Sequence, residues 1–507
     1  MRVLHYNWAD PDDTAGRGGG VRHYMQGLIR ALAQRPGCRV NTLSSGLAHD
    51  LRARAPRWRH VRDAHFEIVN ARPLAPSQAD FASPAQISHP PTEAAFRDFL
   101  RQTGPYDIVH FHTLEGLPAQ VLEIAAEHAR VAFSLHNYHT LCAQVNLWRQ
   151  ERTHCRDFAN GQHCRTCLPL MPDPRAVRRA YQLETCLARL GPGPGRWACD
   201  RVLRPLLRRG WRMARRLARR RGDAAAPPAL LDHAQRRARI VGLVNAHCAR
   251  VLAVSERTRA IALAHGMARV QTLYIGTDQA RKWARSTPRK WPARFTAERP
   301  LRLTYLGYMR RDKGFAFLLG ALADLPMPLA QRIHLTVAAH QGDARMMAQM
   351  DALRGHLAGL RWCDGYTHSG LDVLLADTDL GVVPPLWQDN LPQTALEMHA
   401  RHIPILTSDR GGASELGGSD ALVFRAGDSA GFAARLAQVL DGQVCLQRYW
   451  AQARAPQDMA RHADALAHHY TTMLQEGEDE SADPYRHSEI GDIVDPGVSR
   501  RQSRRAV

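Results

Sequence analysis

Two carboxylates stand close together in a short segment of the second half of the chain. Asp389 and Glu397 lie eight positions apart in the stretch Asp-Asn-Leu-Pro-Gln-Thr-Ala-Leu-Glu. That spacing is about two turns of an α-helix, so both side chains are expected near one helix face. The first turn of a helix tolerates a proline such as Pro392, and Asn390 is a suitable helix cap. Carboxylates in such a position are suited to hold sugar hydroxyls.

An apolar run at 380–385 directly precedes this segment and predicts a buried strand. In α/β proteins, the loop and helix that follow the carboxyl end of a parallel strand bind nucleotides and phosphates. The two carboxylates are therefore expected beside a bound phosphate. This combination indicates sugar-nucleotide chemistry.

A glycine-rich turn and a lysine offer further contacts for a ligand. Gly18, Gly19 and Gly20 let the backbone approach a ligand and present amides at the start of a helix, although an ordinary surface turn is the alternative. The turn lacks the G-x-G-x-x-G spacing, which disfavours a dinucleotide site. Lys313 follows the first strand of the second half and can meet a diphosphate as a point charge, or can simply be solvated.

Alternating strand and helix patterns surround these residues and predict two parallel α/β sheets. In the first half, strands are expected at 2–8, 39–45, 66–71, 106–113, 131–138, 250–255 and 270–275. In the second half, they are expected at 301–308, 333–339, 360–366, 380–384, 403–407 and 421–424. We predict two Rossmann-like domains that face each other across a cleft.

Composition sets the expected domain boundaries. The first domain is expected at 1–280, a linker at 281–300 and the second domain at 301–445. Helices at 446–475 are expected to return to the first domain, and the charged segment 476–507 is expected to be disordered. Within the first domain, 142–167 is a cysteine-containing loop and 168–248 is a basic helical insertion.

The charge of the chain favours an anionic partner. The 507 residues include 68 lysines and arginines against 48 acidic residues, which gives a formal net charge of +20. Nucleic acid, a membrane surface and a phosphorylated substrate all suit this charge. No apolar run is long enough to span a membrane, no apolar signal core is found at the start, and cysteines are sparse. We expect a cytoplasmic protein.

Short motifs occur along the chain in a defined order. They lie at 18–24, 106–112, 134–138, 254–256, 274–278, 305–307, 312–315, 389–397 and 408–415. The ordered set resembles the two-domain nucleotide-sugar glycosyltransferases of the GT-B type, specifically the large retaining family 4 (glycosyl transferases group 1). The resemblance implies a GT-B fold, a nucleotide-sugar donor in the cleft, and sugar transfer with retention of the anomeric configuration.

The resemblance also implies roles for single residues. Glu397 corresponds to a ligand of the ribose hydroxyls, and Asp389 to a position beside the transferred sugar where the family has glutamate. The donor pocket is implied to be lined by backbone at Asn390, Leu391, Pro392, Gly411 and Gly412.

His136 ends a predicted strand where the family carries a histidine near the transferred sugar. Its ring can bond a sugar hydroxyl or share developing charge, which makes it a candidate catalytic residue. A buried structural histidine is the alternative, and the competing histidines are His110, His112 and His139.

Tyr308 stands where the family usually has a phosphate-binding arginine. Arg310 or Arg311 is therefore expected to supply the second cation beside Lys313. In retaining enzymes of this family, the departing diphosphate oxygen is thought to take the acceptor proton, so no protein nucleophile and no catalytic metal are required. The protein would contribute by positioning the substrates and neutralising the diphosphate.

Four cysteines form the pattern C-x12-C-x8-C-x2-C directly after His136. They are Cys142, Cys155, Cys164 and Cys167. Four thiolates suit a structural zinc ion, and some members of the family carry similar cysteines here. Unpaired thiols or a disulfide are the alternatives.

Arginines dominate the segment 175–221, where Glu184 and Asp200 are the acidic residues. Apolar residues at helical spacing predict a basic amphipathic helix at 203–219, suited to an anionic membrane surface. Such a helix would bring the enzyme to a lipid-linked acceptor at the inner face of the membrane; a helix packed on the first domain is the alternative. Nucleic acid is not expected, because no aromatic platform is interleaved with the arginines.

The sequence therefore predicts a hexosyltransferase-type glycosyltransferase of polysaccharide or glycolipid biosynthesis. Its donor is expected to be a nucleotide sugar and its acceptor a glycan or a lipid-linked glycan. A GT-B-type nucleotide-sugar epimerase is one alternative. A catalytically inactive sugar-nucleotide-binding protein is the other, prompted by Asp389 and Tyr308.

Overall fold

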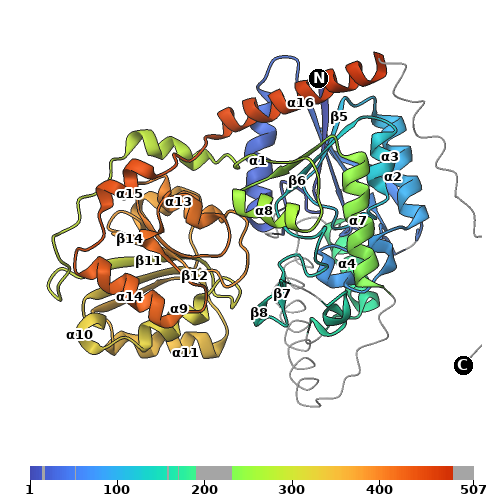
Figure 1. Cartoon of the computed structure of the whole chain (residues 1–507). Coiled ribbons are helices and arrows are strands. Elements are labelled where there is room, and N and C mark those ends of the chain that lie inside the picture. Colours follow the sequence, from blue (N-terminus) through green and yellow to red (C-terminus); the bar gives the residue numbers. More distant parts are fainter. Residues whose placement is uncertain (14–16, 52, 157–158, 169–170, 190–230, 483–507) are drawn as a thin grey trace, which may run out of the picture.

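The computed structural model describes residues 1–13, 17–51, 53–156, 159–168, 171–189 and 231–482, with the backbone alone for 187–189 and 478–482. These residues form two α/β domains, and one long helix, α16 (Met459–Ala482), extends from the second domain along the first (Figure 1).

The first domain is built, within the described residues, on an eight-stranded sheet of order β10-β9-β6-β5-β1-β2-β4-β3. Its pairs are parallel except for the antiparallel pair of β3 with β4. The strands are β1 Arg2–Tyr6, β2 Arg39–Ser45, β3 Arg57–Arg62, β4 His65–Val69, β5 Ile108–Phe111, β6 Arg130–Leu135, β9 Arg250–Ala253 and β10 Val270–Thr272. The central strands are buried, as parallel strands covered on both faces must be.

Helices cover both faces of this sheet. α1 and α16 lie on one face, and α2, α3 and α7 lie on the other (Figure 1). The helices of the first domain are α1 Gly19–Ala33, α2 Pro90–Thr103, α3 Val121–Ala126, α4 Pro174–Arg189, α7 His233–His247 and α8 Glu256–Ala264.

The second domain has, in the described part of the chain, a six-stranded parallel sheet of order β13-β12-β11-β14-β15-β16. Its strands are β11 Leu301–Tyr308, β12 Ile333–His340, β13 Gly359–Cys363, β14 Leu380–Val383, β15 Ile405–Ser408 and β16 Val423–Phe424. Its helices are α9 Phe315–Ala323, α10 Met327–Ala330, α11 Ala344–Ala352, α12 Leu371–Leu374, α13 Gln393–His399, α14 Ser429–Leu440 and α15 Leu446–Gln452. The prediction of two Rossmann-like domains is confirmed.

Three strands were not expected from the sequence. β3 carries Arg57, Arg59 and Arg62 on an edge of the sheet, and its charged residues hide the strand pattern. The others, β7 (Trp148–Arg149) and β8 (Thr153–His154), form a two-residue hairpin ladder that is too short to leave a periodic signal.

The expected linker at 281–300 packs against the second domain. Phe295 is fully buried in the second core, and the Trp291 indole donates to the carbonyl oxygen of Asp379 at 3.2 Å. Trp283 stacks on the ring of His402 with centroids 4.0 Å apart. The segment is therefore an edge of the second domain, because its aromatic side chains find their apolar partners there.

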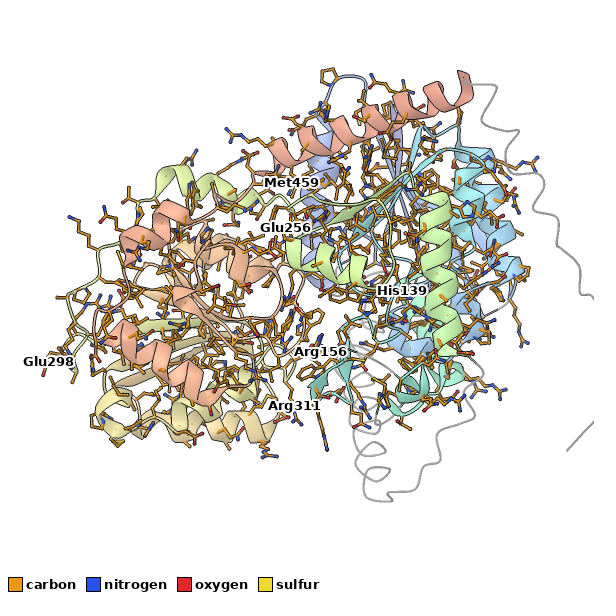
Figure 2. The ribbon with its side chains drawn as sticks, viewed as in Figure 1. His139, Arg156, Glu256, Glu298, Arg311 and Met459 are labelled. Atoms are coloured by element: carbon orange, nitrogen blue, oxygen red, sulfur yellow. The ribbon has the colours of Figure 1, made fainter. Side chains whose placement is uncertain are left out.

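The helices after residue 445 differ from expectation in two ways. α15 stays with the second domain, since Tyr449 is buried in that core and its hydroxyl accepts from the amide of Ile405 at 3.3 Å. Only α16, which begins at Met459 (Figure 2), reaches the first domain, where the Tyr470 hydroxyl lies 2.6 Å from His110 Nδ1. α16 also continues to Ala482, so it includes the first seven residues, 476–482, of the segment expected to be disordered.

The expected insertion at 168–248 is only partly described. Its last part is α7, a helix of the first core with Ile240 and Val244 fully buried. We therefore correct the prediction: α7 belongs to the domain core and is not part of an insertion. The amphipathic helix expected at 203–219 lies outside the described residues, as does 483–507. Among the helices that the structure describes, none combines the length and apolar character needed to cross a membrane.

Candidate active site

A cavity of about 640 Å³ lies between the two domains. In the first domain, its wall is formed by the start of α1 and the end of β6. In the second domain, it is formed by the segments that follow β11, β13 and β14 and by the start of α13. These segments follow the carboxyl ends of parallel strands, where α/β folds bind their ligands.

Most of the residues singled out from the sequence line this cavity. They are Gly19, Gly20, His136, Lys313, Asp389, Asn390, Leu391, Pro392 and Glu397. Gly411, Gly412 and Arg311 are not among the lining residues.

An ion pair between Lys313 and Asp389 crosses the second-domain wall of the cavity. The Lys313 ammonium lies 2.6 Å from Asp389 Oδ2 and 5.0 Å from the centre of the Trp387 ring. Asp389 is 7% exposed, so this ion pair is largely shielded from water on the carboxylate side. The helix α13 begins only at Gln393, with Pro392 as its cap, so Asp389 lies on the preceding loop rather than on the helix.

Asn390 does not cap α13 as expected from the sequence. Its amide nitrogen donates to the carbonyl oxygen of Leu135 at 3.3 Å, across the boundary between the domains. This bond links the loop of Asp389 to the end of β6, directly before His136. The loop is therefore tied to the first domain by this bond.

Gly411 and Gly412 support the Asp389 loop from behind instead of facing the donor cavity. The Gly412 amide lies 3.0 Å from each of the carbonyl oxygens of Asp389 and Asn390. The Gly411 amide donates to Gln388 Oε1 at 3.0 Å. Because these donors are already bonded within the protein, we correct their expected role in the donor pocket.

Gly411→Ala is expected to destabilise the protein by about 3 kcal/mol or more, because a Cβ at this position would lie 1.7 Å from the Asp389 carbonyl oxygen. Gly427→Ala is the matched control. Gly427 has a φ of 79° against 80° for Gly411, but its Cβ would have no neighbour within 4 Å. Urea unfolding of both variants shows how far the loss at Gly411 exceeds that at a glycine of similar positive φ without a clash. Equal losses would show that Asp389 and Gly411 do not pack this closely.

Neither arginine expected beside Lys313 reaches the cavity. Arg310 forms an ion pair with Asp312: its Nε donates to Oδ1 at 3.0 Å and its Nη2 donates to Oδ2 at 2.5 Å. Arg311 is exposed on the second domain (Figure 2). Tyr308 lines the cavity and is 51% exposed. Among the described lining residues, Lys313 is thus the one lysine or arginine, and the expected second cation is absent from this set.

Glu397 also lines the cavity, is buried and has two side-chain partners. Tyr366 donates to its Oε2 at 3.2 Å, and His368 Nδ1 lies 3.0 Å from its Oε1. The hydrogen bond to Glu397 raises the pKa of His368. The ring of His23 from α1 lies against His368 with centroids 4.8 Å apart. The two domains therefore meet around Glu397.

Tyr366 and His368 were missed by sequence reasoning. Both follow the carboxyl end of β13, and this position was the available signal, because such loops face the ligand side of a parallel sheet. Trp387 and His340 line the cavity for the same reason, after β14 and at the end of β12.

His136 ends a chain of hydrogen-bonded histidines that leads from the cavity into the first core. His112 Nδ1 lies 3.0 Å from His136 Nε2, and His5 Nδ1 lies 2.9 Å from His112 Nε2. Burial lowers the pKa of His136 and of His5 to about 3. Both rings are therefore neutral at physiological pH, and His136 offers a sugar a hydrogen bond rather than a positive charge.

Comparisons with known proteins agree with this geometry. Residues 300–442, almost the whole second domain, match the model of the glycosyl transferases group 1. The chain is similar in fold to sucrose-phosphate synthase from Thermosynechococcus elongatus, at 13% identity and a TM-score of 0.53, covering 94% of this chain and 100% of that one. The fold is that of the GT-B glycosyltransferases.

Two further GT-B structures have a similar likeness. Starch synthase IV from Arabidopsis thaliana, solved as a catalytic domain with ADP and acarbose, has 12% identity and a TM-score of 0.51 over 94% of this chain and 99% of that one. Trehalose-phosphate synthase from Burkholderia xenovorans, solved with glucose-6-phosphate, has 13% identity and a TM-score of 0.51, and the match covers 93% of this chain and 100% of that one. A comparison with curated proteins gives no significant match. The fold and the second-domain match together support a GT-B glycosyltransferase.

The four cysteines of the C-x12-C-x8-C-x2-C pattern are neighbours in the first domain. Cys142, Cys155 and Cys167 each act electrostatically on Cys164, whose pKa burial raises to about 12. In the described part of the chain, however, the side chains whose ligand atoms gather within 4.8 Å are histidines, His5 with two others, and not these cysteines. Tetrahedral zinc thiolates need sulfur atoms about 3.8 Å apart. The cluster does not have that spacing, and the zinc site stays a prediction.

Proposed function

We propose that the protein transfers a sugar, with retention of configuration, from a nucleoside diphosphate sugar to a glycan or lipid-linked acceptor. The observation that carries the proposal is that Lys313, Asp389 and Glu397 line one cavity between two Rossmann-like domains. All three belong to the segment that matches the glycosyl transferases group 1. A hexosyl donor, a place in polysaccharide or glycolipid synthesis, and a cytoplasmic enzyme held at the membrane by 175–221 are parts of the same proposal.

Different residues of the cavity contact different parts of the donor. Glu397 accepts hydrogen bonds from the ribose, since a carboxylate with two partners still has free lone pairs. Lys313 has three N–H donors and contacts the diphosphate while keeping one bond to Asp389. The amides at the start of α1, Gly19 and Gly20, face the same anion.

The transfer step follows from this placement. Asp389, oriented by Lys313, holds a hydroxyl of the transferred sugar, and neutral His136 bonds another from the first domain. As the sugar leaves, negative charge develops on the diphosphate, and Lys313 stabilises it. The departing oxygen takes the proton of the acceptor hydroxyl, while the acceptor oxygen forms the new bond to the anomeric carbon. No protein nucleophile takes part.

A thermal-shift screen with UDP-, GDP- and ADP-sugars tests the donor site. We expect one nucleotide class to raise the melting temperature and Glu397→Ala to abolish that shift, because the ribose loses its acceptor. Glu298→Ala is the control, since Glu298 is an exposed glutamate far from the cavity (Figure 2). If no nucleotide sugar stabilises the protein, or if Glu397→Ala binds as the wild type does, the donor site is wrongly assigned.

A sugar-nucleotide-binding protein without transferase activity is the second candidate. The observation that favours it is the lack of a second lysine or arginine among the described lining residues, with Tyr308 in the place of the family's arginine. Binding without transfer or hydrolysis, unrestored by Asp389→Glu, would support this candidate. Acceptor-dependent release of the nucleoside diphosphate would exclude it.

A further inference from the structure

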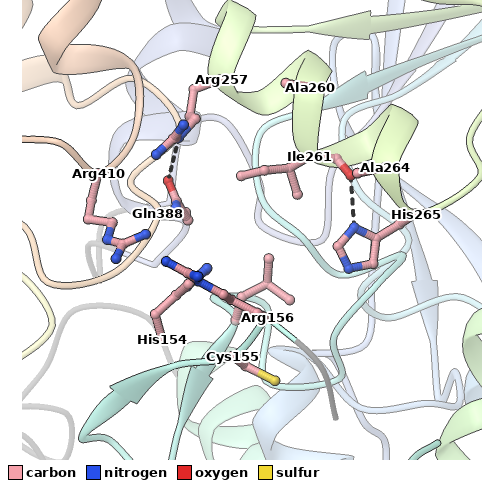
Figure 3. Close-up of a pocket in the computed structure, with 11 residues that line it drawn as sticks. His154, Cys155, Arg156, Arg257, Ala260, Ile261, Ala264, His265, Gln388 and Arg410 are labelled. Carbon is pink, nitrogen blue, oxygen red and sulfur yellow. Dashed lines mark hydrogen bonds between the residues drawn. The ribbon is translucent and has the colours of Figure 1, made fainter. Parts of the chain in front are cut away.

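A second cavity, of about 330 Å³, borders the donor cavity between the domains. Gln388 lines it, and its two neighbours Trp387 and Asp389 line the donor cavity. The first domain contributes the end of the β7–β8 hairpin and the helix α8, and the second domain contributes Gln388 and Arg410 (Figure 3). A group held here would lie next to the sugar-binding carboxylate.

Three arginines from different elements converge on this cavity. Arg156 follows β8, Arg257 lies at the start of α8, and Arg410 follows β15 (Figure 3). Arg257 donates to Gln388 Oε1 at 3.2 Å and to the Asp409 carbonyl oxygen at 3.0 Å, both of them neutral acceptors. The Arg156 side chain has no hydrogen bond or ion pair with the residues that the structure describes.

The positive charge of this arginine cavity is poorly balanced by the protein. None of the described lining residues is acidic. The carboxylate of Asp409 lies 3.6 Å from Arg410 Nε, which is longer than a hydrogen bond, and that buried Nε has no hydrogen-bond partner in the described structure. Glu415 is nearby, but its oxygens accept from the backbone amides of residues 256 and 257 and from the hydroxyl of Tyr274.

Burial and the excess of positive charge in this cavity lower the pKa of two groups, His154 and Arg410. Burial, followed by the charges of Arg410, Arg156 and Arg257, lowers the pKa of His154 to about 4. Burial also lowers the pKa of Arg410, and the neighbouring arginines lower it further against the opposing effect of Asp409. Three guanidinium groups that face one another repel, so an anion that bridges them is stabilised.

We propose that the arginine cavity binds a phosphate or diphosphate group of the acceptor substrate. Guanidinium groups bind phosphate oxygens through paired N–H donors, and two or three of them match the charge of a phosphate. The proposal rests on the proposed function, because it gives the chemical class of the acceptor for the neighbouring donor cavity. Since Arg410 belongs to the second domain and the other two to the first, the same anion joins the domains.

Binding of inorganic pyrophosphate to the full chain, measured by calorimetry, tests the site. The double variant Arg156→Gln with Arg410→Gln is expected to bind about 100-fold more weakly than the wild type. Arg152→Gln is the matched control, because Arg152 lies in the same hairpin, is exposed and does not line the cavity. Lys313→Ala reports on binding in the donor cavity. Loss of binding in Lys313→Ala alone would overturn the proposal.

The source of the phosphate and the proposed function are tested separately. A hexose phosphate, a polyprenyl diphosphate in detergent micelles and phosphatidylglycerol vesicles are each offered to the wild type and the double variant. Arginine-dependent binding of either of the first two identifies the acceptor class. Binding to the vesicles alone would mean a lipid contact and would contradict an acceptor site. Nucleotide-sugar binding is also measured in the wild type and the double variant, and the two are expected to bind equally. A wrongly assigned donor site and a wrongly assigned arginine site therefore give different results.

Discussion

Lys313→Ala is expected to lower the rate of sugar transfer by about 1000-fold, with a smaller effect on the binding of the nucleotide sugar. Lys313 is the one lysine or arginine among the described residues that line the donor cavity, so no second lysine or arginine of this set replaces it at the diphosphate. Its charge acts mainly on the leaving group, whose negative charge grows in the transition state. Initial rates over a range of donor concentrations separate kcat from KM.

The same variant also leaves the buried carboxylate of Asp389 without its partner. Removing one member of a buried ion pair costs about 3 kcal/mol or more in unfolding free energy. Adding Asp389→Asn should restore that stability, which would show that the loss comes from the unpaired carboxylate. The catalytic role of Lys313 is judged from the transfer rate of the single variant, because Asp389 itself contacts the transferred sugar. Lys282→Ala is the control, because Lys282 forms an exposed pair with Asp372 outside the cavity. A Lys313→Ala enzyme with nearly full activity would contradict the mechanism.

Acidification from pH 7.5 to 5.5 is expected to lower the unfolding free energy by on the order of 5 kcal/mol through four buried histidines of the first domain. They are the three of the hydrogen-bonded chain and His110, whose ring stacks on that of His112. Burial lowers the pKa of His5 and His136 to about 3 and places those of His110 and His112 well below 6.5. The unfolded chain binds protons at these histidines below pH 6.5 while the folded protein does not. Their stabilisation is therefore complete above pH 6.5 and is lost as the pH falls.

Urea unfolding at several pH values measures this loss. His112→Gln keeps polar atoms in the chain but removes one titrating ring, so the difference between pH 7.5 and 5.5 should shrink by about 1.4 kcal/mol. His128→Gln is the control, since His128 is exposed. Other ionisable groups cancel when the variants are compared. An unchanged pH dependence in His112→Gln would mean that this ring is not buried in its neutral form.

The order of strands and helices could be predicted from the sequence because it follows from local patterns. Runs such as Leu380–Val383 are apolar throughout and are buried on both faces of the sheet. The strands β2 and β11 begin and end at the predicted residues. The edge strand β3 was missed because burial, and not the backbone pairing, produces the pattern that sequence reasoning detects.

The candidate site was predictable where one segment carries it. The motifs pointed to Asp389, Glu397 and Lys313, and to the turn of Gly19 and Gly20, because each follows a predicted strand at its carboxyl end. The errors concern residues judged by their neighbours in sequence. Arg311 was expected in the site because it lies close to Lys313 in the chain, but consecutive side chains in a loop point in different directions.

By itself, the sequence determined the fold class and the strand ends at which chemistry takes place, since both depend on the alternation of apolar and polar residues over short distances. Only the tertiary structure decided which side chains meet. It pairs Lys313 with Asp389, packs Gly411 behind that loop, and gathers Arg156, Arg257 and Arg410 from both domains. Such contacts join residues that are distant in the chain, and they depend on strand order and domain placement, which no local pattern contains.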